Sequence, residues 1–159
     1  DVEFITELCV ALDTGLDSKV STKLDKIYLE YDETFAKQKD FEKRVTEFFD
    51  MFAKEFSSLK KTKIVSLNSM HDLFIAATHL KYGIPGLEDL IDEKPIGAYF
   101  KDAKKALSGL EKLSNAIEVE SDEDWVKDFA LASKRSTTKK RERGVKIKFM
   151  IRALKGLIK

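Results

Sequence analysis

Basic residues gather in the last 26 residues of the chain, where they could bind phosphate. Residues 134–159 hold eleven Lys and Arg and a single acid, for a net charge of +10, whereas residues 1–133 carry −9. Clustered guanidinium and ammonium groups bind nucleic-acid phosphates, and a helix N-terminus behind the hydroxyl residues 136–138 would add backbone N–H donors. With DNA as the expected partner, the predicted phosphate-contacting residues are Arg135, Lys139, Lys140, Arg141, Arg143, Lys148 and Arg152.

Helical spacing divides this segment into an apolar stripe and an exposed basic stripe. Lys148 and Arg152 lie on the exposed stripe, whereas Arg143 and Lys140 fall on the backward extension of the apolar one. These last two side chains either belong to a helix end that projects beyond the core or pair with acids such as those of residues 118–128. The apolar stripe consists of Ile147, Met150, Ile151, Leu154 and Ile158.

Two further interpretations of the basic segment stay open. It is a solvated charged face, partly neutralised by the acidic residues 118–128, or it binds an acidic protein surface. A membrane surface is disfavoured because the apolar stripe lacks Trp, carries only Phe149 as an aromatic residue and is needed by the core. If the segment contacts about six phosphates, its affinity for nucleic acid should fall by orders of magnitude as the salt concentration rises from low to moderate.

Residues that could carry catalysis or hold a metal ion are few. His71 and His79 lie eight positions apart, which in a helix separates them by about 80° and about 12 Å, too far to share one ion. We expect structural roles for both, with His79 near a helix end bonding a carbonyl group. The lone Cys9 excludes an internal disulfide and a cysteine zinc site, so a buried thiol in a reducing, cytoplasmic setting is expected.

Signatures of the common enzyme classes do not occur in the chain. It has no phosphate-binding glycine loop, no serine-nucleophile elbow and no Glu-x-x-His pair. Asp122 and Asp124 are better explained as the acidic start of a helix. We therefore predict no catalytic residue, no metal site and no cofactor, and an enzyme within these 159 residues is only a third hypothesis.

The elements that must position the basic residues are helices. Of the 159 residues, 43% are hydrophobic and 36% charged, and only seven are Gly and two Pro. Apolar residues recur at steps of three and four, and no segment alternates for long with the period of a strand. No apolar run is long enough to cross a membrane. The predicted fold is all-α, a single bundle of six or seven helices over residues 1–159 with a basic C-terminal helix in 134–159.

Spacing and end signals predict the individual helices. A Phe-rich stripe indicates a core helix over residues 37–59, and all-round apolarity indicates a central buried helix over about 67–82, ended by Gly83. Pro95 suits the first position of a helix over residues 95–117. Shorter helices are expected at 2–12, 18–31 and 87–91, and another begins near residue 121 with Trp125, Val126, Phe129 and Ala130 facing inward.

Three stretches, taken in order, resemble a known protein family. The first combines residues 7–12 (ELCVAL) with 24–31 (LDKIYLEY), the second is residues 73–83 (LFIAATHLKYG), and the third is residues 136–143 (STTKKRER). Together they resemble the helical region that follows the ParB-like nuclease-fold domain in a family of bacterial and archaeal restriction and phage-defence proteins. The resemblance spans most of the chain.

The resemblance implies a DNA-targeting protein whose catalytic centre lies outside this chain. The family's Asp-Gly-Gln-Gln-Arg site and the His-Asn-His domain of some members have no counterpart here. Because the chain begins at Asp1 rather than Met, we expect a piece of a larger protein, with the catalytic domain of the same polypeptide as a partner. The implied function is an accessory helical domain that shapes this catalytic domain, contacts DNA, or both. The alternative is a structural or interaction module whose basic helix docks on an acidic surface.

Overall fold

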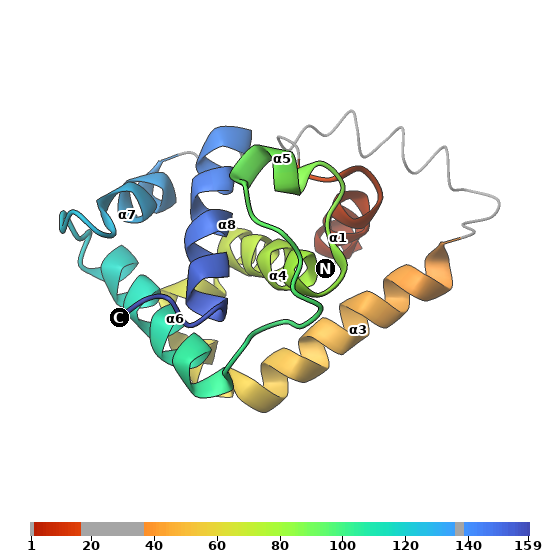
Figure 1. Cartoon of the computed structure of the whole chain (residues 1–159), viewed down its shortest axis with the longest axis horizontal. Coiled ribbons are helices and arrows are strands. Elements are labelled where there is room, and N and C mark those ends of the chain that lie inside the picture. Colours follow the sequence, from red (N-terminus) through yellow and green to blue (C-terminus); the bar gives the residue numbers. More distant parts are fainter. Residues whose placement is uncertain (1, 17–36, 136–138) are drawn as a thin grey trace.

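The computed structural model describes residues 2–16, 37–135 and 139–159 of the chain. Within these ranges it consists of α-helices and two short 3₁₀-helices, without strands (Figure 1), so the predicted all-α class is confirmed. The helix expected at 18–31 lies outside the described residues. The elements are α1 (Val2–Thr14), α3 (Gln38–Glu55), η1 (Ser57–Lys61), η2 (Lys63–Val65), α4 (Leu67–Tyr82), α5 (Leu87–Ile91), α6 (Ala103–Glu118), α7 (Lys127–Lys134) and α8 (Lys140–Leu154).

Helix α4 occupies the centre of the molecule, as its all-round apolarity predicts. Every residue from 71 to 80 is buried, including the polar ones. The helix begins where the Ser66 hydroxyl accepts a hydrogen bond from the Ser69 backbone N–H, at 3.3 Å. It ends at Gly83, whose φ of +83° is a conformation that favours glycine.

Helix α8 packs against α4, α6 and α7 and also contacts α5, and Figure 1 shows it between α7 and α5. Its apolar stripe is buried from Ile147 to Leu154. The helix stops at Leu154 instead of continuing to Ile158 because Gly156, at φ +73°, reverses the chain. There the N–H groups of Gly156 and Leu157 donate to the carbonyl oxygens of Ala153 and Arg152, both at 2.9 Å.

The Phe stripe of α3 packs on the central helix. Phe48 is fully buried and meets Phe74 of α4 edge to face, with ring centroids 5.1 Å apart. The helix is shorter than the predicted 37–59, because the chain tightens into η1 and η2 after Glu55. This change lets Leu59 and Ile64 both reach the core, where each is fully buried.

The helix predicted from Pro95 begins only at Ala103. The backbone N–H groups of Ile96 and Gly97 both donate to the Leu80 carbonyl oxygen, at 2.7 and 3.0 Å, and these bonds tie the segment to α4 in a non-helical conformation. The cap comes later, where the Asp102 carboxylate accepts from the backbone N–H of Lys105 at 2.9 Å.

Trp125 faces outward, so its predicted inward orientation is wrong. Val126, Phe129 and Ala130 are buried as predicted, but 43% of Trp125 is exposed. The physical reason is that α7 starts at Lys127, which leaves Trp125 in the preceding turn and off the helical stripe.

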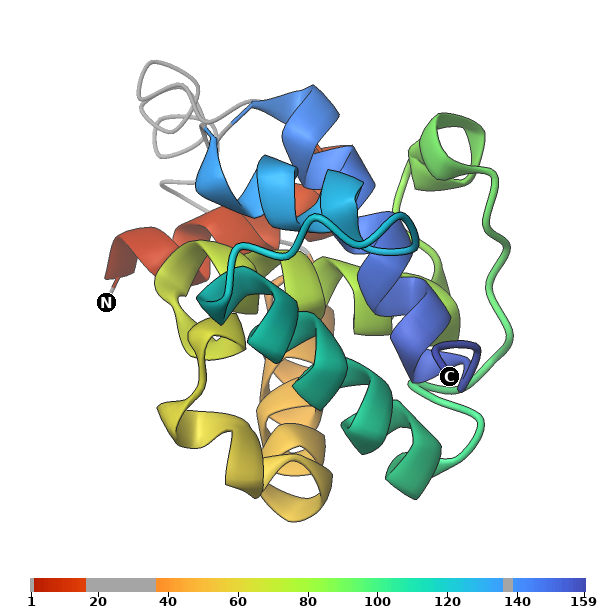
Figure 2. The same ribbon diagram turned by 90° about the vertical axis from the view of Figure 1, so that its left-hand side faces the viewer.

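Helices α6 and α8 approach each other closely at Gly109. A Cβ atom at this position would lie 3.0 Å from the Ala153 Cβ and 3.1 Å from its Cα, so a side chain would press on the backbone of α8 (Figure 2 shows both helices). At Gly144, within α8, the nearest atoms belong to Leu90 and Ile91, at 3.8 and 4.0 Å, which is ordinary contact.

These two glycines should therefore respond oppositely to the same substitution. Gly144→Ala should raise the free energy of unfolding by about 1 kcal/mol, because alanine favours the helix and has room. Gly109→Ala should lower it by roughly 1 kcal/mol, because overpacking of about 1–3 kcal/mol exceeds that helix gain. Urea unfolding of both variants measures the difference, and equal stabilisation would contradict the close approach of α6 and α8.

Candidate functional site

The structure separates the basic residues of α8 into a buried pair and an exposed stripe. Arg143 and Lys146 are buried, at 8% and 0% exposure. Arg141, Lys148 and Arg152 are exposed on another side of the helix. The two groups therefore have different chemistry, although they alternate along the same fifteen residues.

The buried pair shares a single carboxylate, that of Asp72 on α4. Arg143 Nε lies 3.0 Å from Asp72 Oδ1 and donates a hydrogen bond to it. Lys146 Nζ lies 2.8 Å from Asp72 Oδ2, but without the alignment of a hydrogen bond. Asp72 and Lys146 are both fully buried. Their attraction therefore acts where little water screens it.

His71 extends this ionic cluster toward α1. The Arg143 Nη2 group contacts His71 Nδ1, and because a guanidinium only donates, Nδ1 is the acceptor and the ring proton lies on Nε2. Phe4 of α1 meets the imidazole edge to face, with ring centroids 6.3 Å apart. We call His71, Asp72, Arg143 and Lys146 the buried ionic cluster, and it joins α4 to α8.

Arg143 is thus placed differently from the other predicted phosphate contacts. It pairs with an acid, which is one of the two outcomes anticipated for it, but that acid is Asp72 and not a member of residues 118–128. Sequence reasoning missed Asp72 and Lys146. The available signals were the position of Arg143 on the extended apolar stripe and the presence of Asp72 as the one acid within the apolar helix α4.

The exposed stripe consists of Arg141, Lys148 and Arg152. Steps of seven and four residues place these three side chains on one side of α8. They make no ion pair with any residue that the structure describes. The other predicted contacts, Arg135, Lys139 and Lys140, are exposed near the start of the helix.

The start of α8 is electrostatically unusual. Lys139 takes the N-cap position without a side-chain hydrogen bond to the first turn, and Lys140 and Arg141 follow directly. Cations at this end oppose the helix dipole, and the first N–H groups of a helix have no partner within it. An anion bound here would offset both effects.

His79 has a structural position, in line with the role expected for it. Its Nδ1 accepts a hydrogen bond from the Ile84 backbone N–H at 3.0 Å, and its Nε2 donates to the Glu93 carbonyl oxygen at 2.6 Å. Both ring nitrogens are therefore engaged in holding the chain after α4. Among residues 2–16, 37–135 and 139–159, no three His, Cys, Asp or Glu side chains come together as metal ligands.

Comparisons with known proteins do not add to this geometry. No family model matches the chain, and neither a curated protein nor a solved structure matches it at a significant level. The resemblance to the region that follows a ParB-like nuclease-fold domain therefore stays a prediction. Within the described part of the chain, none of the helices has the length and apolarity needed to span a bilayer.

Removing the carboxylate of Asp72 should lower the free energy of unfolding much more than removing one of the two cations that pair with it. Asp72→Asn leaves Arg143 and Lys146 buried without a counter-charge and should cost about 3–5 kcal/mol of unfolding free energy. Lys146→Met keeps the volume and leaves Asp72 paired with Arg143, so it should cost less than about 1.5 kcal/mol. Chemical denaturation of the two variants makes the comparison, and equal losses would contradict this asymmetry.

Cys9 should behave as an unreactive thiol. Its side chain is only partly buried and not fully buried as predicted, but this burial, and after it the carboxylate of Glu42, raises the pKa of the thiol above its ordinary value. A raised pKa leaves less thiolate at any given pH, so reaction with an aromatic disulfide reagent at pH 8 should be slower in the folded protein than in urea. A faster reaction in the folded state would show an activated thiol instead.

Proposed function

We propose that this chain is a helical nucleic-acid-binding domain that contacts the phosphate backbone through the exposed stripe of α8, Arg141, Lys148 and Arg152. The observation that carries the proposal is the division between the cations of α8 that pair with a buried acid and those of the exposed stripe. Arg143 and Lys146 pair with Asp72, whereas the three side chains of the exposed stripe have no ion pair to any described residue. Free cations in one row suit the regular spacing of phosphates.

The start of α8 supports the same proposal. Lys139, Lys140 and Arg141 raise the local positive potential at a helix end that already favours anions. A phosphate seated there would meet backbone N–H donors together with charged side chains. Such contacts position a protein on nucleic acid without reading its sequence.

The location of the stripe limits the direction from which a duplex approaches. Helix α5 borders α8 on one side (Figure 1), and its Glu88 and Asp89 are exposed acids that repel phosphate. The favourable approach is therefore to the side of α8 that faces away from α5.

In line with the resemblance stated above, we further propose an accessory role. The domain would hold DNA for a catalytic domain of the same protein, in a restriction or phage-defence setting. What supports this role is the exposed stripe of cations on α8, together with the resemblance of three stretches of the sequence to that family.

Charge reversal of the stripe tests phosphate binding directly. The triple variant Arg141→Glu, Lys148→Glu and Arg152→Glu should bind a fluorescent DNA duplex at least tenfold more weakly at low salt, measured by anisotropy. The slope of log affinity against log salt should become shallower by about 3, which corresponds to three lost phosphate contacts. Because these side chains are exposed, the melting temperature should change little.

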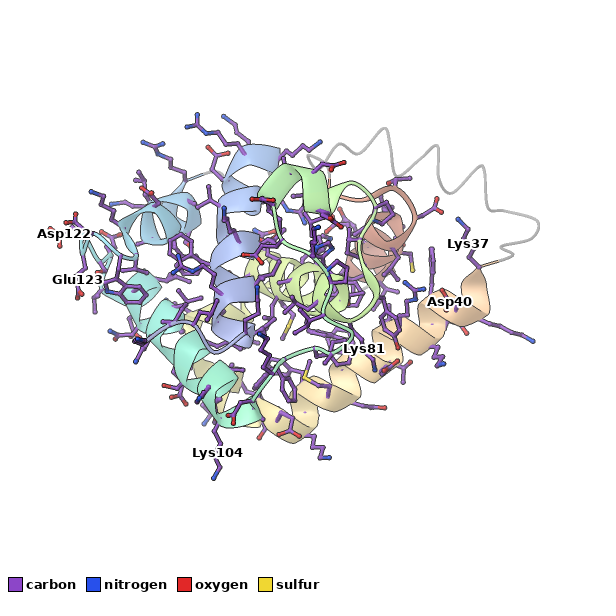
Figure 3. The ribbon with its side chains drawn as sticks, in the orientation of Figure 1. Lys37, Asp40, Lys81, Lys104, Asp122 and Glu123 are labelled. Carbon is purple, nitrogen blue, oxygen red and sulfur yellow. The ribbon has the colours of Figure 1, made fainter. Side chains whose placement is uncertain are left out.

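A matched control has the same change in net charge elsewhere. Lys60, Lys61 and Lys104 are exposed lysines without an ion pair to the described residues, on η1 and at the start of α6. Figure 3 shows Lys104 pointing away from the molecule. Changing all three lysines to Glu should leave most of the affinity for the DNA duplex intact. Equal losses in both triples would mean that only overall charge matters, and no binding by the unmodified chain would refute the proposal.

A further inference from the structure

A groove lies at the end of α6, on a part of the molecule distinct from the exposed stripe of α8. It is formed by α6 from Ser108 onward, the turn that follows and the residues just before α7, with a volume of about 350 Å³. Asn115, Val119, Ser121 and Trp125 are among its lining residues. Its shape is open to solvent, so it suits a chain segment lying across it.

Trp125 and Val119 give the groove an apolar surface that the fold leaves uncovered. They are 43% and 61% exposed. The indole is fixed in place because its Nε1 donates to Glu123 Oε2 at 2.9 Å. With its polar atom already paired, Trp125 offers a partner its ring face, and the fixed orientation lowers the entropy lost on binding.

Negative charge surrounds this apolar surface. Between residues 111 and 128 there are seven acids and only two lysines. Of these two lysines, Lys127 pairs with Asp124 at 3.0 Å, and Lys112 lines the groove without an ion pair to any described residue. Lys134 of α7 pairs with Glu120 at 3.1 Å. The acids without an ion pair to any described residue are Glu111, Glu118, Asp122, Glu123 and Asp128, of which Glu123 accepts the hydrogen bond from Trp125.

Of these acids, Glu111 and Glu123 line the groove, and the others lie in the same stretch of the sequence. Glu111, Asn115 and Glu118 follow one side of α6 at steps of four and three, so the two carboxylates lie about 10 Å apart along the helix. Asp122 and Glu123 project from the tip of the turn between α6 and α7, as Figure 3 shows. A ligand that complements all of them needs several cations distributed over its length.

We propose that this groove binds a basic polypeptide segment of a partner protein, in which an apolar side chain is flanked by arginine or lysine residues. The apolar side chain would rest against Val119 and Trp125. A neighbouring guanidinium would stack on the indole face, with Glu123 beside it, as cation–π contacts require. The exposed amide of Asn115 would hydrogen-bond the peptide backbone.

The charge pattern selects this occupant over the others. Nucleic acid is repelled by the acids, so the groove is independent of the phosphate-binding function proposed for α8. A small amine would satisfy one carboxylate and leave the rest of the groove empty. A polypeptide with regularly spaced cations satisfies both the length of the groove and its charge.

The experiment uses the chain's only Trp as its reporter. Trp125 fluorescence is titrated, without nucleic acid, with a blocked peptide of two arginines, a leucine and two arginines. Binding should be saturable and should shift the emission to shorter wavelength as the indole leaves water. A peptide with serine in place of leucine should bind at least fivefold more weakly, and one with glutamates in place of the arginines should not bind.

Variants locate the binding to the groove. The double variant Glu111→Lys with Glu118→Lys should lower the affinity for the arginine–leucine peptide at least tenfold. The double variant Glu88→Lys with Asp89→Lys makes the same change in charge on α5 and should leave that affinity within about twofold. With a dye-labelled peptide, Trp125→Ala should weaken binding and Leu131→Ala, an exposed apolar residue outside the groove, should not.

Three results would overturn the proposal. The first is an unchanged Trp125 spectrum up to millimolar peptide. The second is equal loss of affinity in the α5 and α6 charge variants, which would indicate a non-specific effect of net charge. The third is sedimentation showing self-association that Glu111→Lys with Glu118→Lys abolishes, because the occupant would then be a second copy of this chain. Failure of DNA binding would leave these measurements unaffected.

Discussion

One carboxylate, that of Asp72, pairs with both cations that α8 turns toward the core. Placing three charges in the interior is expensive, and the arrangement is tolerated only because the opposite charges lie within 3.0 Å of each other. Arg143 is 71 positions from Asp72 in the sequence, and Lys146 is 74 positions from it. These two ion pairs fix the rotation of α8 about its own axis. A rotation by one residue would bury exposed cations without any acid to meet them. The position of the exposed stripe therefore follows from the buried ionic cluster.

The sequence predicted those helices whose ends and buried sides depend on residues close to them in the chain. The Phe stripe of α3, the apolar α4 and its stop at Gly83, and the outward side of α8 at Lys148 all follow from helical spacing and cap chemistry. The resulting fold class is the one expected. Together these three helices supply a large share of the core.

Contacts between distant residues explain what the sequence could not predict. Pro95 is a good first residue for a helix, but two backbone hydrogen bonds to Leu80 hold the next residues out of one. The acid that Arg143 meets, Asp72, lies on another helix, so the residues that neighbour Arg143 in the sequence do not identify it. Trp125 was expected on the inward face of a helix that begins near residue 121, yet α7 begins only at Lys127 and leaves Trp125 in the preceding turn, 43% exposed.

The contact at Gly109 has a consequence for how the two proposed surfaces relate. At Gly109 no long side chain separates α6 from α8, so a relative shift of the two helices there would press one backbone against the other. The groove on α6 and the stripe on α8 therefore keep a constant separation. A ligand that bound both surfaces at once would have to span this fixed distance, so the pair of helices would select ligands by their length.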